Sequence, residues 1–431
     1  MTPIVVEADL TWTGASFERG LQVTVAENGR IEAVGALGRV PSQRLPRCAL
    51  LPGFVNAHSH AFQRGLRGHG ERFPEGTGSF WTWREAMYGL VGRLGRVTLR
   101  ALSVQAFGEM LDAGITAVGE FHYVHHERDN DYALDEVVLQ AAAEAGIRVV
   151  LLQTFYATGA VGRPLEGAQR RFATPSLDGF LGQLDVLAKR VDPRTQSLGA
   201  VAHSIRAAHP DQIRAVYDEA QRRGLPFHMH VEEQRREIDE CRAAYGRTPM
   251  AAILDCLDGR GDFTAVHCTH TEPADMARFL AAGGRVCLCP LTEGNLGDGI
   301  PGLGAPHAAG GRLCLGSDSN ARLSSLEEMR WLEYGQRLRG EMRGALADAQ
   351  GNVVATLLAA ATTGGAHALG LDAGRIVAGA WGDLVAIDLD TPSLAGVPPE
   401  RLLDAIVFGA GNAVIAGTFV GGRWRATSHR T

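Results

Sequence analysis

The sequence predicts an α/β protein: a (β/α)8 barrel of the TIM type with a small β-sandwich domain formed by both chain termini. Eight short apolar runs alternate with helix-like segments along the middle of the chain, as in a parallel sheet wrapped by helices. Short strand patterns around tight turns recur at both ends. No glycine-rich phosphate turn follows the first apolar run, which disfavours an open, doubly wound sheet.

The strand patterns of the two ends are short and bounded by turn residues. Apolar residues alternate over residues 21–25, and Asn28-Gly29 then supplies the dipeptide typical of a β-hairpin turn. Residues 383–387 and 413–424 resemble strands in the same way. No helix of useful length is expected in either terminal stretch. We therefore expect the two ends to share one β-domain.

These patterns divide the chain into three stretches. We expect residues 1–49 to form the first part of the β-sandwich, residues 50–370 the barrel, and residues 371–431 the second part of the sandwich. The predicted barrel strands are Leu50–Ala57, Ile115–Glu120, Ile147–Gln153, Leu198–His203, Pro226–Val231, Phe263–His267, Arg285–Cys289 and Leu313–Gly316.

Two of the intervening helices have clear signals. Residues 101–113 and 132–145 carry apolar residues at helical spacing, and each stretch ends at a glycine, Gly114 or Gly146. Residues 61–100 form a long insertion after the first strand. Long loops at the carboxyl end of barrel strands commonly contribute to function.

Composition narrows the class of function. Apolar residues make up 45% of the chain and charged residues 21%, as in soluble globular proteins, and the formal net charge is −6. This mild acidity argues against nucleic-acid binding and favours a small-molecule substrate. No stretch approaches the roughly 20 apolar residues of a membrane helix, and no signal peptide is recognisable. We expect a cytoplasmic protein with no membrane or nucleic-acid partner.

Histidines and one aspartate stand where predicted strands end. His58 and His60 are two residues apart, so a strand points both side chains to one face. The fifth, sixth and eighth strands end near His230, His267 and Asp318. Imidazole nitrogen and carboxylate oxygen are typical zinc ligands, and a catalytic zinc site keeps one position open. The pattern predicts a metal site at the mouth of the barrel.

This ordered set, from LPGFVNAHSH at the first strand to GSDS at the eighth, resembles the amidohydrolase superfamily over essentially the whole chain. The resemblance implies that His58, His60, His230 and Asp318 bind the metal and that His267 contacts the attacking water. It also implies a homodimer.

His228 shares a strand face with His230 and is the alternative ligand. His230 is preferred because Glu233 follows it by three residues, as in the deaminases of the superfamily. Two-metal members generally bridge the ions with a carboxylated lysine at a strand end, but the one lysine, Lys189, lies in a helix-like segment. Glu120 is the remaining candidate bridge. We expect one divalent ion per chain, with zinc as the expected metal.

The expected reaction is hydrolysis of a C–N bond. A zinc ion lowers the pKa of a bound water towards about 7 and so makes hydroxide available at neutral pH. His267 and Asp318 are expected to orient and deprotonate that water, and Glu233 to carry its proton to a substrate nitrogen.

Several segments resemble the formimidoylglutamate deiminases of the superfamily: HSHAFQRGLRG, SFWTWREAMYGLVGRL, EFHYVHH, AVAHSIRA, LTEGNLGDG and EMRWLEYGQRLR. The resemblance implies a dicarboxylate substrate, N-formimino-L-glutamate. Arginine suits carboxylates because its planar group donates two parallel hydrogen bonds. The implied substrate-binding residues are Gln63, Arg84, Tyr123, His203 and Arg206.

Three alternatives stay open. Arg84 could instead stack on Trp81 or Trp83 in a purely structural role. The enzyme could be an aromatic deaminase that uses the same metal and Glu233 on a purine-like or pyrimidine-like ring. The chain could also be an inactive barrel that serves as an assembly partner, but that reading expects missing metal ligands, and none is missing.

Overall fold

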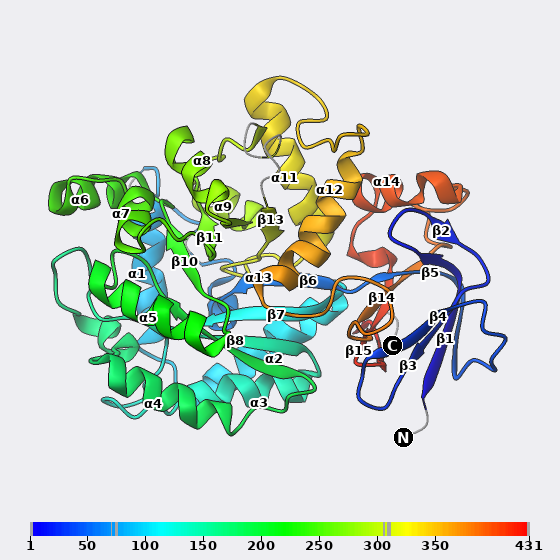
Figure 1. Cartoon of the computed structure of the whole chain (residues 1–431), viewed down its shortest axis with the longest axis horizontal. Helices are drawn as coiled ribbons and strands as arrows, with labels where there is room; N and C mark the ends of the chain where they lie inside the picture. The colour runs from blue at the N-terminus through cyan, green and yellow to red at the C-terminus, as the bar shows by residue number, and fades with distance from the viewer. Residues whose placement is uncertain (1–2, 70, 74–75, 305–306, 308–311, 429–431) are drawn as a thin grey trace.

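The computed structural model describes residues 3–69, 71–73, 76–304, 307 and 312–428. Figure 1 shows two parts: parallel strands surrounded by helices, and a β-rich part that contains both ends of the chain. Among the helices described, none is both long enough and apolar enough to cross a membrane.

Eight parallel strands form the centre of the larger part. They belong to two four-stranded sheets, β6-β7-β8-β9 and β10-β11-β12-β13. Their bounds are Phe54–Ser59 (β6), Ile115–His122 (β7), Arg148–Phe155 (β8), Gln196–Ala202 (β9), His228–Val231 (β10), Thr264–His267 (β11), Arg285–Leu288 (β12) and Arg312–Leu315 (β13). Each predicted run overlaps one of these strands.

Backbone hydrogen bonds bridge the two sheets at both seams. The amide of Ser317 donates to the carbonyl of His58 at 2.9 Å, which links the end of β13 to β6. The amide of His230 donates to the carbonyl of His203 at 3.0 Å, which links β10 to the end of β9. Both bridges lie at the carboxyl ends of the strands, so these ends are held close together.

Helices cover the outside of these strands (Figure 1). The predicted terminator Gly146 ends α3 in the left-handed conformation (φ 84°), and Gly224 ends α5 in the same way (φ 65°). The helices are Phe80–Val91 (α1), Arg96–Asp112 (α2), Asp135–Ala145 (α3), Leu177–Ala188 (α4), Pro210–Arg223 (α5), Arg235–Tyr245 (α6), Pro249–Cys256 (α7), Pro273–Ala281 (α8), Pro290–Leu296 (α9), Ser325–Gly340 (α11), Val353–Ala359 (α12) and Gly365–Ala368 (α13). Short helical turns are Ala61–Leu66 (η1), Gly167–Phe172 (η2), Ala360–Gly364 (η3) and Asn412–Val414 (η4).

Strands from both ends of the chain form one hydrogen-bonded sheet, in the order β16-β15-β14-β5-β1-β3-β4, with β2 paired to β1. Their bounds are Ile4–Trp12 (β1), Phe17–Glu18 (β2), Gln22–Val25 (β3), Ile31–Gly35 (β4), Gln43–Pro52 (β5), Leu384–Asp388 (β14), Ile415–Val420 (β15) and Arg423–Ala426 (β16). The shared terminal β-domain was therefore predicted well. Its division into two packed layers stays a prediction.

Two details differ from the sequence prediction. The run Leu50–Ala57 is not one strand: its first residues end β5, and β6 begins only at Phe54. A Cβ on the intervening Gly53 would lie 2.1 Å from Oγ1 of Thr116, so the close crossing needs glycine. The expectation of no helix near the carboxyl end was wrong, because α14 (Pro399–Gly409) begins at a proline and buries apolar residues at helical spacing.

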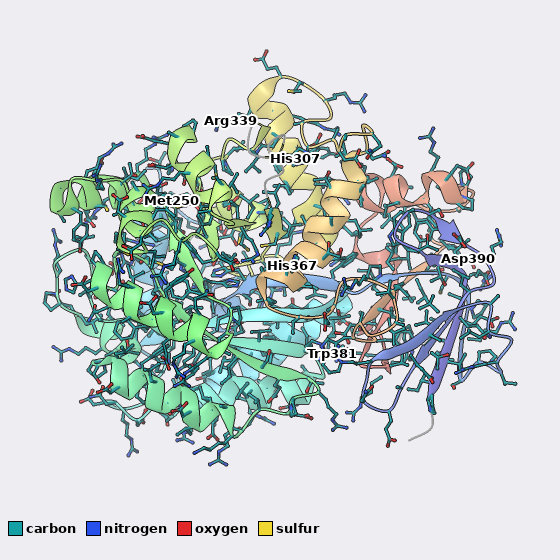
Figure 2. The ribbon with its side chains drawn as sticks, viewed as in Figure 1. Met250, His307, Arg339, His367, Trp381 and Asp390 are labelled. Carbon is teal, nitrogen blue, oxygen red and sulfur yellow. The ribbon has the colours of Figure 1, made fainter. Side chains whose placement is uncertain are left out.

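A buried ion pair joins the two parts. Arg148, at the amino end of β8, bonds Asp383 through Nε at 2.6 Å and Nη2 at 3.0 Å. Its guanidinium carbon lies 3.9 Å from the ring centre of Trp381, which Figure 2 labels where the two parts meet. Arg148 and Asp383 are each 2% exposed. This clamp lies at the amino ends of the strands, away from the carboxyl ends described next.

Candidate active site

His58 and His60 lie side by side at the carboxyl end of β6. The alternation of the strand turns both rings the same way, and their centres are 4.7 Å apart. His58 is 0% exposed and His60 3% exposed. The predicted HxH pair is thus buried and paired at the predicted strand end.

Two more predicted ligands meet this pair. His230 comes from β10 and Asp318 from the segment after β13. Nε2 of His58 lies 3.1 Å from Nε2 of His230 and 3.6 Å from Oδ1 of Asp318, and Nε2 of His60 lies 3.3 Å from that oxygen. All four ligand atoms lie within 4.8 Å of one another.

The outer ring nitrogens show which way the histidines face. Nδ1 of His60 donates to the carbonyl of Phe121 at 2.8 Å, and Nδ1 of His230 donates to the carbonyl of His203 at 3.0 Å. Burial lowers the pKa of both rings, which favours the neutral form. Their Nε2 lone pairs therefore point into the cluster, as in metal ligands oriented by backbone carbonyls.

The donor set fits a divalent metal ion. Burial lowers the pKa of His58 to about 3, so this ring is also neutral. Burial opposes ionisation of Asp318, but its hydrogen bond to His58 and its proximity to His60 and His267 outweigh burial and lower its pKa. Three neutral imidazoles and one carboxylate are ligands that zinc and similar ions accept.

His267 and Glu233 stand beside the cluster. Nε2 of His267 lies 3.8 Å from Oε1 of Glu233 and 3.9 Å from Oδ2 of Asp318, and it has no hydrogen-bond partner among the described residues. Burial raises the pKa of Glu233 above its usual value, and the charges of His267 and Arg206 oppose that rise. His267 and Asp318 have positive φ angles of 74° and 47°, a strained conformation that is enriched at functional sites.

A second carboxylate holds His267 from behind. Nδ1 of His267 lies 3.2 Å from Oε1 of Glu293, which also accepts the amide of Cys289 at 3.0 Å. Burial opposes a charge on His267. The charge of Glu233 and the bond to Glu293 outweigh it and raise the pKa of His267 to about 10. His267 is therefore held as a proton donor that faces Glu233.

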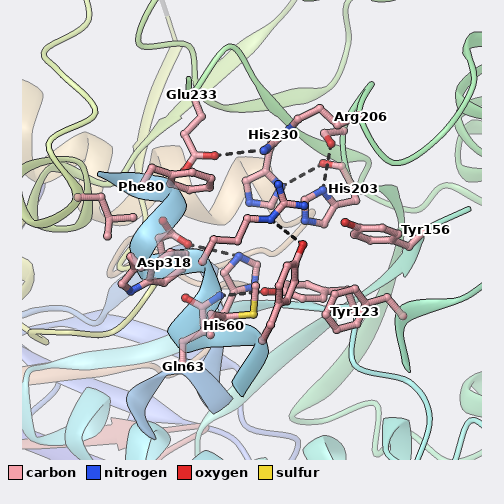
Figure 3. Close-up of a pocket in the computed structure, with 17 residues that line it drawn as sticks. His60, Gln63, Phe80, Tyr123, Tyr156, His203, Arg206, His230, Glu233 and Asp318 are labelled. Carbon is pink, nitrogen blue, oxygen red and sulfur yellow. Dashed lines mark hydrogen bonds and ion pairs between the residues drawn. The ribbon is translucent and has the colours of Figure 1, made fainter. Parts of the chain in front are cut away.

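A pocket opens over the cluster, and Figure 3 shows Gln63 and His60 at one end of it and Arg206 and Glu233 at the other. His60, His230, Glu233 and Asp318 contribute to its wall. Its lining also includes all five predicted substrate-binding residues, which are Gln63, Arg84, Tyr123, His203 and Arg206.

The polar groups at the Gln63 end form a fixed pair. Nε2 of Gln63 donates to the hydroxyl of Tyr123 at 2.9 Å. Its Oε1 atom is buried and accepts no bond from any described residue. Burial raises the pKa of Tyr123 well above its usual value, so the hydroxyl keeps its proton. This end of the pocket therefore offers an unused acceptor beside a neutral hydroxyl.

Arg84 makes the aromatic contact considered for it and also lies in the pocket wall. It lines the pocket, and its Nε donates to the hydroxyl of Tyr88 at 2.6 Å. Its guanidinium carbon also lies 5.3 Å from the ring centre of Trp81. The aromatic contacts hold the guanidinium at the pocket, so stacking does not exclude binding.

The alternative ligands lie elsewhere. Nε2 of His228 donates to the carbonyl of Ala368 at 2.7 Å. Lys189 caps the end of α4, as its helix-like surroundings predicted. Glu120 accepts the amide of Ala61 at 2.6 Å and so holds the start of η1. Neither His228 nor Glu120 belongs to the four-ligand group.

Similarity to known proteins agrees with this geometry. Residues 49–425 match the model of the Amidohydrolase family. The chain belongs to the amidohydrolase family. The resemblance seen in the motifs is thereby confirmed.

Two relatives within the family have named activities, and a third has a solved structure. A formimidoylglutamate deiminase of Pseudomonas aeruginosa is 42% identical over 87% of this chain and 84% of its own length. A 5-methylthioadenosine/S-adenosylhomocysteine deaminase of Natronomonas pharaonis is 30% identical over 87% of this chain and 80% of its own. The crystal structure of an amidohydrolase from Brucella melitensis superposes with a TM-score of 0.85 at 31% identity, covering 98% of this chain and 94% of that one.

The sequence did not predict a second buried cluster, which forms around Asp135. Nε2 of His122 and Nδ1 of His125 meet Oδ1 of Asp135 at 3.0 and 2.9 Å, and Gln153 and Gln183 donate to its Oδ2 at 2.7 and 2.9 Å. The cluster holds the segment that carries Tyr123. In the sequence, the HYVHH motif was the feature that could have indicated this cluster. Its partners Asp135, Gln153 and Gln183 lie on other elements.

Two buried glutamates near the site, Glu237 and Glu293, were also not predicted from the sequence. Glu293 lies in the quoted LTEGNLGDG segment, and Glu237 lies four residues after Glu233, in the first turn of α6. Neither sequence position marks a catalytic role, because buried and solvated glutamates look alike in a sequence. Only the packing shows that both are buried against the site.

Proposed function

We propose that the chain is a formimidoylglutamate deiminase, which hydrolyses N-formimino-L-glutamate to N-formyl-L-glutamate and ammonia in histidine breakdown. The observation that carries the proposal is that the guanidinium groups of Arg84 and Arg206 line the pocket directly over the metal-ligand group. A substrate with an amidine at one end and two carboxylates at the other matches that arrangement. The 42% identity to the Pseudomonas aeruginosa enzyme of that name supports the same substrate.

His58, His60, His230 and Asp318 would hold one metal ion, for which we propose zinc because the ligands are nitrogen and carboxylate oxygen. When bound, such an ion makes a water nucleophilic near neutral pH and polarises the amidine. The helical position of Lys189 supports a single ion, since no carboxylated lysine is available at a strand end.

The chain's own residues move the protons. Glu233 accepts a proton from water and delivers it to the terminal nitrogen of the amidine. His267, held by Glu293, and Asp318 orient that water between them. The water oxygen bonds to the amidine carbon, the bond from that carbon to the terminal nitrogen breaks, and this nitrogen leaves as ammonia with both water hydrogens.

The polar lining orients the substrate. Arg206 and Arg84 bind its two carboxylates. Oε1 of Gln63, the hydroxyl of Tyr123 and the ring of His203 contact the amidine end. Burial and the neighbouring Arg206 lower the pKa of His203 well below its usual value, so a neutral ring faces the substrate.

An aromatic deaminase is the second candidate. The Natronomonas pharaonis relative and the rings of Phe80, Trp83 and Tyr156 in the lining favour it. The two guanidinium groups argue against it, because a neutral ring offers neither of them a carboxylate to bind.

Ammonia release from formiminoglutamate and from 5-methylthioadenosine, measured side by side with metal content, tests the proposal. We expect about one ion per chain and ammonia from formiminoglutamate alone. His58→Ala and Asp318→Ala should lose metal and activity together. Ammonia from the nucleoside alone would favour the aromatic deaminase. Full metal content with no turnover of either compound would favour an inactive barrel.

We also propose three coarser features. The bridged seams support a closed (β/α)8 barrel at residues 50–370, with residues 1–49 and 371–431 as the β-sandwich. All seven cysteines are described and none forms a disulfide, which supports a cytoplasmic location. A homodimer is supported by the family resemblance.

A further inference from the structure

Arg206 lies between two carboxylates. Its Nη2 donates to Oε2 of Glu233 at 3.3 Å, and its Nε lies 3.8 Å from Oε2 of Glu237. Among the described residues, no hydrogen bond involves its Nη1. Glu237 therefore faces Nε, on the inner edge of the guanidinium, and Glu233 faces Nη2, one of its two tips. The other tip, Nη1, is left for a ligand.

Glu237 is an unusual group to find in this place. It lies in the first turn of α6 and is 0% exposed. Neither of its oxygens makes a hydrogen bond of normal geometry within the described chain. Burial is the main cause that raises its pKa to about 7, and the charges of Glu232 and Glu233 add to the effect. Arg206 is the cation that opposes these effects.

A buried carboxylate that makes no hydrogen bond of normal geometry is costly, so its retention needs a compensating interaction. The ion pair with Arg206 is that interaction. Its geometry matters because a ligand carboxylate that approaches the tips of Arg206 competes with Glu233 for Nη2. It does not compete with Glu237, which sits at Nε.

We propose that Glu237 is a positioning residue for anion recognition: it anchors the inner edge of Arg206 so that the guanidinium tips face the pocket. A ligand carboxylate then takes Nη2 and releases Glu233 towards the metal-ligand group. Without the charge of Glu237, Arg206 has only Glu233 as an acid partner and closes onto it. This inference rests on the proposed function, because it assumes an anionic substrate.

The test measures binding of glutarate, a five-carbon dicarboxylate, to the metal-loaded protein by calorimetry. Glu237→Gln keeps the volume and removes the charge, and we expect its Kd for glutarate to rise about tenfold or more, as for a lost charged hydrogen bond. The KM for formiminoglutamate should rise in parallel, and the KM for N-propylformamidine, which has no carboxylate, should stay unchanged.

Two further variants separate positioning from packing. Glu237→Asp keeps the charge but is shorter, so we expect a Kd between those of the wild type and the Gln variant. A packing role predicts that Asp is worse than Gln. Glu240→Gln is the matched control, because this residue lies on the same helix, pairs with Arg236 at 2.8 Å and is not among the residues that line the pocket. It should bind glutarate as the wild type does.

The outcomes are distinguishable. Unchanged glutarate affinity in Glu237→Gln, equal losses for the charged and uncharged substrates, or no glutarate binding by the wild type would each overturn the inference. A wild type that binds glutarate but releases no ammonia from formiminoglutamate would refute the proposed function. The affinity series would then still decide the role of Glu237.

Discussion

Glu233 is the residue that we propose carries the proton. In the structure described, it is buried, bonded to Arg206 and 3.8 Å from His267. A group that must both take and give a proton works best when its pKa lies near the working pH. Burial raises the pKa of Glu233 in that direction.

Glu233→Gln removes the proton carrier and keeps its size. We expect near-normal metal content, because Glu233 is not one of the four grouped ligands, and activity lower by at least about 100-fold. Steady-state ammonia release and elemental analysis measure both. Near-normal turnover would mean that the proton reaches the nitrogen by another route.

Arg206→Met tests recognition of the substrate rather than chemistry. Formiminoglutamate turnover should fall far more than that of N-propylformamidine, because only the former loses a charge-assisted hydrogen bond. Metal content should be unchanged. Parallel kinetics on the two compounds decide the matter, and equal losses would remove the main reason to prefer a dicarboxylate substrate over a ring.

At the scale of elements, strand ends were the predictable feature. Period-two alternation placed His58 and His60 on one face, and parallel strands must end at one edge, so His230 and Asp318 could be expected near them. What lies behind the ligands could not be predicted. Asp135 and Glu293 act across elements that are distant in sequence, and no spacing rule connects such pairs.

Glu120 is a buried residue that holds the start of η1, and the protonation of its carboxyl group depends on pH. Burial raises its pKa to about 8, and it accepts the amide of Ala61 at the start of η1. The native state thus keeps a proton that the unfolded chain releases near the ordinary value of 4.5. Between these two values the native state binds more protons, so stability falls as pH rises.

Glu120→Gln cannot ionise and should lose this part of the pH dependence. We expect its free energy of unfolding, relative to that of the wild type, to rise from about pH 5 to about pH 8 by a few kcal/mol, at about 1.4 kcal/mol per pKa unit. Urea unfolding at the two pH values measures the difference. A constant difference would show that Glu120 is already ionised at the lower pH.

For the whole molecule, the clamp between Arg148 and Asp383 carries a separate prediction. Arg148→Met leaves a carboxylate buried without its partner, which typically costs about 3–5 kcal/mol of stability. The KM should not change, because Arg148 lies at the amino end of β8. Thermal unfolding and kinetics measure the two quantities. Asp383→Asn in the same chain should recover part of the loss, and a changed KM would show that the clamp reaches the pocket.

The terminal sheet combines strands from both ends of the chain, and this constrains when it can form during synthesis. β5 pairs with β1, which the ribosome makes earlier, and with β14, where Leu384 faces Pro52. The amides and carbonyls along the β14 edge of β5 therefore stay unpaired until nearly the whole polypeptide has been synthesised. At about 5–20 residues per second this delay lasts tens of seconds. An open strand edge invites pairing with other chains, so a nascent chain stalled before β14 would be a natural client for chaperones.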